Sequence, residues 1–113
     1  MPFDGLPEGL VSDLVKLRVA CAGLKRGWTQ RTLGGPGAEN HCALGWLLVA
    51  AEWDEAESTR LALDYVYPAL PKSAQQEESP LRAIFQFNDR NATSHRRMVK
   101  LFEDAIALAE KAV

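Results

Sequence analysis

Apolar residues recur along much of the chain at the three- and four-residue spacing that is typical of amphipathic helices. The first stripe of this kind comprises Leu10, Leu14, Leu17, Cys21 and Leu24. It predicts a helix that begins at Pro7 or Glu8 and ends near Arg26, with Asp13 facing away from the core. Proline or glutamate suits a first helical turn, and a cationic last turn followed by glycine favours termination.

The middle of the chain predicts two further helices. A nearly continuous apolar run over 42–51 indicates a buried central helix. Its Gly45 costs about 1 kcal/mol relative to alanine, so we expect another backbone or an aromatic ring to pack close to it. Asp54, with a glutamate three residues later, predicts the N-cap of the next helix, which Pro68 and Pro71 are expected to end.

The last third of the chain predicts a short helix, a turn and a long final helix. Ser79 and Pro80 suit the N-cap and the first position of the short helix. The Asn and Asp residues within 88–91 favour a turn, after which Thr93 or Ser94 is expected to cap the final helix. The buried stripe of that helix comprises Met98, Phe102, Ala105, Ile106, Ala109 and Val113.

Two loops are expected between these helices. Segment 27–41 is rich in glycine and forms a long loop or a tight hairpin, and Trp28 with Gln30 is expected to anchor its start. Loops longer than about 12 residues in a compact domain are usually functional or mobile. A polar loop is expected at about 72–79. We therefore predict an all-α fold, a single compact domain over residues 1–113 with four or five helices and one long Gly-rich loop.

The composition fits a soluble globular protein. The 113 residues are 47% hydrophobic and 25% charged, with a formal net charge of -2, which provides no overall attraction to nucleic acid or to an anionic membrane. Two cysteines are too few for a disulfide scaffold and favour a reducing compartment. The longest apolar run is too short to span a membrane, and the N-terminus does not resemble a signal peptide. We expect a cytoplasmic protein without a cofactor.

Three short motifs stand out among the apolar helices. In order, they are Gly27-Trp28-Thr29-Gln30, Cys42-Ala43-Leu44-Gly45-Trp46-Leu47, and Phe87-Asn88-Asp89 followed by Ser94-His95. This set resembles a family of short bacterial and phage-borne proteins that is classed as a domain of unknown function. Trp46, Phe87 and Ser94 stand where that family has a small residue, a tryptophan and a threonine. The resemblance gives weight to the motif positions and implies no particular activity.

Cys42 is the sharpest candidate for chemistry. The dipole of the helix that it begins would lower the pKa of its thiol. His95 or His41 would then act as the base, oriented by Asp89 or Asn88, as in cysteine-dependent hydrolases and transferases. We favour a packed structural thiol instead, because cysteine is often buried and this one leads a strongly apolar helix. The deciding question is whether the thiol and an imidazole meet.

A metal site is not expected. Cys21, Cys42, His41 and His95 are suitable ligand types, but their spacing in the sequence does not match that of known zinc sites.

The basic cluster near the start of the final helix gives a second alternative, an anion or nucleic-acid binder. It comprises Arg90, His95, Arg96, Arg97 and Lys100. The free N–H groups of a helix N-terminus attract anions. A solvated face, paired in part with Glu103 and Asp104, is the favoured interpretation of this cluster.

The leading interpretation is a small non-enzymatic helical protein with a binding or accessory role. The motif residues would be mainly structural and would form three separable features: a packed helix start, a loop anchor and a turn with a cap. The residues singled out for binding are Trp28, Gln30, Asn88, Arg90, Arg96, Arg97 and Lys100. We expect a protein partner or self-association, because Trp46, Trp53, Tyr65 and Tyr67 exceed what a four-helix core readily hides. Nucleic acid is a less favoured partner, and no membrane partner is expected.

Overall fold

In a computed structural model of the protein, residues 8–76 and 79–112 are described, and side chains are described for 12–75 and 79–112. The helical elements are, in order, α1 (Glu8–Arg26), α2 (Ala43–Ala50), α3 (Glu55–Leu61), the π-helix η1 (Ala62–Val66), α4 (Tyr67–Ala69), the 3-10 helix η2 (Lys72–Gln76), α5 (Pro80–Asp89) and α6 (His95–Ala112). The predicted all-α fold is therefore confirmed. Pro7, Val113 and the side chain of Leu10 lie outside the described residues.

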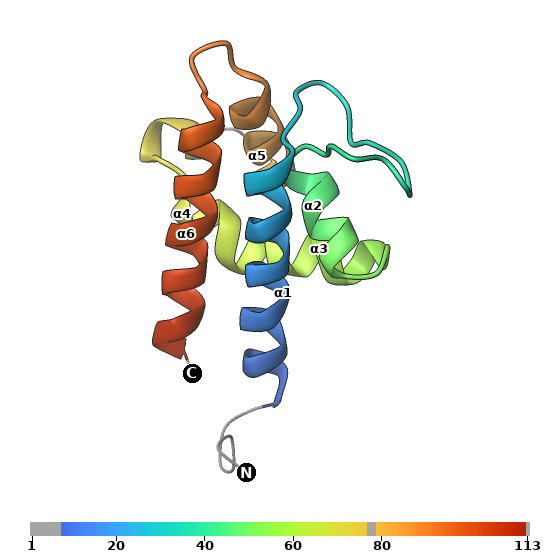
Figure 1. Cartoon of the computed structure of the whole chain (residues 1–113). Helices are drawn as coiled ribbons and strands as arrows, with labels where there is room; N and C mark the ends of the chain where they lie inside the picture. Colours follow the sequence, from blue (N-terminus) through green and yellow to red (C-terminus); the bar gives the residue numbers. More distant parts are fainter. Residues whose placement is uncertain (1–7, 77–78, 113) are drawn as a thin grey trace.

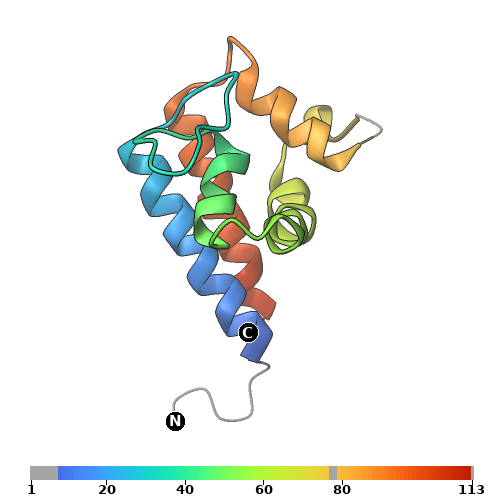
Figure 2. The ribbon, with the colours of Figure 1, turned by 90° about the vertical axis from the view of Figure 1, so that its right-hand side faces the viewer.

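The long helices α1 and α6 lie side by side and run in opposite directions (Figure 1). The short helix α2 packs beside α1, and η1 and α4 pack against α6. Figure 2 shows α5 crossing near one end of this pair, where the loop after α1 meets the chain that follows α5. The largest fully buried apolar side chains in the core are Leu17, Leu24, Leu47, Leu61, Val66, Ile84, Met98 and Phe102.

Three predicted N-caps are confirmed. The side-chain oxygens of Asp54, Ser79 and Ser94 each accept a hydrogen bond from the backbone N–H three residues later, at 3.1, 3.4 and 3.2 Å. Each bond satisfies one of the N–H groups that a helix N-terminus leaves without a partner.

The prediction that Pro68 ends the third helix is wrong. The helical path continues from α3 through η1 and α4 to Ala69. In η1 the chain widens into a π turn, and the N–H of Tyr67 bonds the carbonyl of Ala62, five residues back. Pro68 then lies in the first turn of α4, where its missing N–H costs little. Leu70 adopts an extended backbone before Pro71, so the second proline ends the path.

The predicted turn at 88–91 is also placed too early. Asn88 and Asp89 form the last turn of α5, and the turn itself is at 91–92. The helix extends this far because Phe87 and Asn88 both pack inward. The predicted polar loop at about 72–79 contains the short helix η2.

Gly45 has the close neighbour that the sequence predicts. A Cβ atom at this position would lie 2.2 Å from the carbonyl oxygen of Leu33 in the Gly-rich loop. Helices α1 and α2 also pack closely at Gly23, since a Cβ atom on Gly23 would lie 2.3 Å from the ring of Trp46. Trp46 is buried, and so is Tyr65, which leaves fewer surplus aromatic side chains than the sequence suggests. Among the described helices, none is both long and apolar enough to cross a membrane.

Candidate functional site

A buried asparagine joins the motifs. Asn88 is 1% exposed, and its Oδ1 accepts hydrogen bonds from the indole Nε1 of Trp28 at 2.7 Å and from the N–H of Ala43 at 3.0 Å. Its Nδ2 donates to the carbonyl of Thr29 at 3.2 Å and to Oδ1 of Asp89 at 3.0 Å. A side-chain amide has two donor hydrogens and two acceptor lone pairs, so these bonds use its full capacity.

Further bonds attach the start of the Gly-rich loop to the end of α5. The side-chain amide of Gln30 donates to the carbonyls of Asn88 and Arg90, both at 3.0 Å. The backbone N–H of Arg31 donates to Oδ1 of Asp89 at 2.8 Å. The three motifs, interpreted above as separable features, are therefore one network. That interpretation is wrong because a single side chain, Asn88, bonds the loop, the start of α2 and its own neighbour.

The far end of the loop returns to its start. The N–H of Thr29 bonds the carbonyl of His41 at 3.2 Å, and the N–H of His41 bonds the carbonyl of Gly27 at 3.3 Å. The ring Nδ1 of His41 also lies 2.9 Å from the carbonyl oxygen of Leu33 and 3.1 Å from that of Gly34. The loop is thus closed at its base, while residues 35–40 are exposed.

Cys42 is in an environment that does not activate a thiol. Its side chain is 1% exposed at the N-cap of α2. Burial raises the pKa of the Cys42 thiol, although the backbone N–H groups of Gly45 and Leu44 act in the opposite direction. The helix N-terminus is therefore present, as expected, but the loss of solvation outweighs it.

His95 and Asp89 each have partners of their own. Nε2 of His95 donates to the carbonyl of Leu24 in the last turns of α1, and the imidazole stacks on Trp28 with 5.7 Å between ring centroids. Asp89 accepts bonds from the Gly-rich loop and from its neighbour on α5. Within the described residues, no hydrogen bond joins the thiol of Cys42 to either imidazole.

No group of three or more His, Cys, Asp or Glu side chains is arranged to hold a metal ion in the part of the chain that the structure describes. Cys21 and Cys42 are both buried free thiols.

The basic cluster lies at the surface. Arg90, Arg96, Arg97 and Lys100 are all exposed, and the guanidinium of Arg90 lies 6.0 Å from the centre of the Phe87 ring. Lys100 pairs with a carboxylate one turn later on α6, at 2.5 Å. A pocket of about 360 Å³ lies between α4 and α6, with Arg97 and Lys100 on its border.

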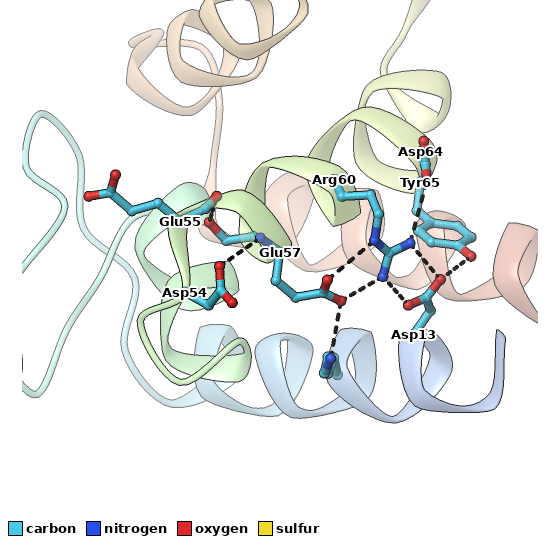
Figure 3. A network of polar contacts seen from close by, with 9 residues as sticks. Asp13, Asp54, Glu55, Glu57, Arg60, Asp64 and Tyr65 are labelled. Carbon is cyan, nitrogen blue, oxygen red and sulfur yellow. Dashed lines mark hydrogen bonds and ion pairs between the residues drawn. The ribbon is translucent and has the colours of Figure 1, made fainter. Parts of the chain in front are cut away.

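A second polar network was not anticipated from the sequence. Asp13 is 2% exposed, although the helical stripe was interpreted with this residue facing away from the core. Arg60 of α3 reaches it with both terminal nitrogens, and Tyr65 of η1 donates its hydroxyl to Oδ2 at 2.6 Å (Figure 3). The spacing in the sequence indicates this burial, because a helix that buries Leu17 and Leu24 turns Asp13 toward the same side.

The carboxylate of Glu57 completes this network. It accepts from Arg60 at 2.6 Å (Figure 3). It also accepts from Lys16 of α1 at 3.1 Å. Burial opposes ionisation of Asp13, but its hydrogen bonds with Arg60 and Tyr65 outweigh burial and lower its pKa. The bonds from Arg60 and Lys16 lower the pKa of Glu57. Burial, followed by the bond to Asp13, raises the pKa of Tyr65 to about 12. These groups satisfy one another, so we assign the network to holding α3 and η1 on α1.

The fold and the first network define a small all-α protein whose long loop is fixed on a buried asparagine. A family model matches residues 15–108, and the chain belongs to that family, which is described as a family of unknown function (DUF6197). The resemblance to a family of unknown function is thereby confirmed. Comparisons with curated proteins and with solved structures found no match.

Proposed function

We propose that the protein is a small, cytoplasmic, non-enzymatic binding protein of bacterial or phage origin, and that its partner contacts the Gly-rich loop. The observation that carries the proposal is the four-bond arrangement of Asn88, which holds the loop on the helical scaffold. A loop ordered before binding loses less conformational entropy when its partner arrives. The two free, buried thiols support a reducing location.

The exposed part of the loop supports a recognition role. Gly34 and Gly37 have φ angles of 73° and 86°, in the left-handed region that glycine adopts at little cost. These two glycines let the loop reverse direction at little conformational cost. Binding residues are often found on loops that a rigid scaffold positions.

The contacts of Cys42, His95 and Asp89 favour this proposal over the cysteine-dependent hydrolase or transferase. A nucleophilic thiol needs an accessible sulfur and a lowered pKa, whereas burial raises the pKa of Cys42. We expect iodoacetamide to modify the native protein slowly at pH 7, and to modify both thiols rapidly after unfolding in urea. Rapid alkylation of native Cys42 at pH 7 would contradict the non-enzymatic assignment.

The binding role is tested with a panel of ligand classes and two matched glycine variants. Gly35→Ala and Gly37→Ala both place a methyl group in open space, but only Gly37 has a left-handed backbone. We expect at least one class among nucleotides, sugars, amino acids, acidic peptides and basic peptides to bind the wild type in calorimetry. Gly35→Ala should bind equally well and Gly37→Ala more weakly, because its loop must change shape. Absence of binding to every class, or equal binding by both variants, would contradict the proposal.

The anion or nucleic-acid binder remains a second candidate because Arg96 and Arg97 are exposed and have no ion pair within the described residues. Salt-dependent retention on heparin that disappears in the double variant Arg96→Ala/Arg97→Ala would favour it. Absence of retention at low salt would remove it.

A further inference from the structure

A pocket of about 530 Å³ lies beside the Gly-rich loop, where it meets the end of α1 and the end of α2. Its lining includes the charged side chains of Arg26 and Glu39 at the surface and the rings of His41, Trp46 and Trp53. This volume is in the range of sites that bind small molecules and cofactors. The aromatic rings and the two charges give the pocket both an apolar and a polar part.

His41 brings an unpartnered nitrogen to this pocket. Its Nδ1 contacts two carbonyl oxygens, which only accept hydrogen bonds, so Nδ1 carries the proton. In the neutral ring, Nε2 is then an acceptor. His41 is only 2% exposed. In the described residues, every side-chain nitrogen or oxygen that is fully enclosed has a hydrogen-bond partner. Nε2 has no hydrogen bond, so this atom retains a small exposed area, and the His41 side chain is part of the pocket lining.

Trp53 is held in an unusual conformation at the pocket wall. Its φ is 66° and that of Glu52 is 54°, both in a region that bulky residues rarely adopt. Its N–H bonds the carbonyl of Leu48 at 2.7 Å, which closes the end of α2, and Glu52 occupies the left-handed position of this cap where glycine is common. The indole is 36% exposed and lies 6.0 Å from the His41 ring, centroid to centroid. It therefore offers a partly open aromatic surface.

Arg26 and Glu39 are available for a ligand. Both are exposed, and neither forms an ion pair within the described residues. A guanidinium binds phosphate through several donors, and a carboxylate accepts from sugar hydroxyls. The cation at the border disfavours a cationic ligand, even though aromatic rings alone would suit one.

Within the proposed binding role, we infer that this pocket binds a nucleotide. The base stacks on Trp53 and donates an N–H to Nε2 of His41, the phosphate pairs with Arg26, and the ribose hydroxyls donate to Glu39. This assignment rests on the proposed function and specifies its ligand class. It uses the two exposed charges of the pocket, Arg26 and Glu39, and the ring nitrogen of His41 that has no partner in the protein.

The test is calorimetric titration of the full chain with adenosine 5′-monophosphate, the three other common nucleoside monophosphates, adenosine and inorganic phosphate. Loss of stacking in Trp53→Leu should weaken nucleotide binding about tenfold or more. Phe85→Leu is its control, since Phe85 is similarly exposed on α5, away from the pocket. Arg26→Gln should weaken binding of the nucleotide and leave adenosine unchanged. Arg18→Gln, a variant of an exposed arginine on the same helix, should change neither.

His41→Asn tests the nitrogen directly. Asparagine retains a donor near the position of Nδ1 and lacks the acceptor at Nε2, so the loop contacts have a substitute while the base loses its partner. We expect weaker nucleotide binding with an unchanged circular dichroism spectrum. If this variant unfolds, the Trp53→Leu and Arg26→Gln pairs still decide the question.

Two further comparisons distinguish a free nucleotide from one within a nucleic-acid strand, and failure of this inference from failure of the proposed function. Tighter binding of a single-stranded hexanucleotide than of any monophosphate would assign the pocket to a nucleotide within a nucleic-acid strand, and the reverse order to a free nucleotide. No binding of either, or equal binding by Trp53→Leu and Phe85→Leu, overturns the inference. The proposed function then stands if any class of the panel binds in a manner sensitive to Gly37→Ala, and it fails as well if none does.

Discussion

Replacing Asn88 by alanine should remove the connection between the Gly-rich loop and the helices. The variant loses four hydrogen bonds at a site that is 1% exposed. Each such bond contributes about 1 kcal/mol net, so the loss in the free energy of unfolding should not exceed about 4 kcal/mol. Trp28 and Asp89 are half-buried and can regain water, whereas Ala43 is fully buried and its N–H is left without a partner. We therefore expect a loss of about 3 kcal/mol in the free energy of unfolding, a large share of the 5–15 kcal/mol typical of a domain.

The measurement is urea denaturation followed by circular dichroism, with linear extrapolation to water. Asn91→Ala is the matched control, because Asn91 is exposed and accepts only a 3.3 Å bond from Arg31. It should change stability by about 0.5 kcal/mol or less. Amide hydrogen exchange should also become faster across residues 27–41 in Asn88→Ala. A loss below 1 kcal/mol, or one equal to that of the control, would refute the assignment of Asn88 as the residue that holds the loop.

Two further predictions concern the scaffold. Asp13→Asn should lower the free energy of unfolding by about 2 kcal/mol at pH 7, because the paired Arg60 is partly exposed and solvent screens part of the interaction. Since the folded-state pKa of Asp13 is lowered, its stabilisation is present above the ordinary carboxyl value of 3.8 and is lost as pH falls through the folded pKa. Urea denaturation below pH 4 should therefore show a flatter pH dependence for Asp13→Asn than for the wild type, and equal slopes would contradict the pairing. Gly45→Ala should destabilise the fold by about 1–3 kcal/mol despite alanine's higher helix propensity, because the new methyl group meets the Leu33 carbonyl. Gly35→Ala, in open space, should have little effect, and a neutral result at Gly45 would show that the loop yields easily.

The sequence predicts the helices and their caps well because those features depend on local chemistry. The oxygen of an N-cap residue such as Asp54 reaches a donor only three residues away, so a short pattern contains the information. The position of Pro68 was mispredicted because the π turn before it depends on how η1 packs, with Tyr65 bonded to Asp13 across 52 residues. The spacing of Asp13 indicates its burial but its residue type does not, because a charged side chain usually faces solvent and its partner Arg60 lies 47 residues away in the chain.

The candidate site is divided in the sequence for the same physical reason, because its residues meet only in the fold. Asn88 has the side chain of a turn former, and its neighbours in the chain suggest a turn, so its local interpretation is plausible. Its partners Trp28 and Ala43 are 60 and 45 residues away, and only the packing of α5 against α2 brings them together.

The contacts that the motif residues make in the fold are relevant to function. Cys42 is enclosed, Gly45 leaves room for the carbonyl of Leu33, and Asn88 bonds the N–H of Ala43, so each contributes to seating the loop on the start of α2. A catalytic arrangement would instead leave a reactive atom exposed beside a base. The exposed side chains of Arg26, Glu39 and Trp53 line the pocket beside the loop that these residues hold, together with the ring of His41. We propose that the motif residues support the loop and that the residues around the pocket determine binding specificity.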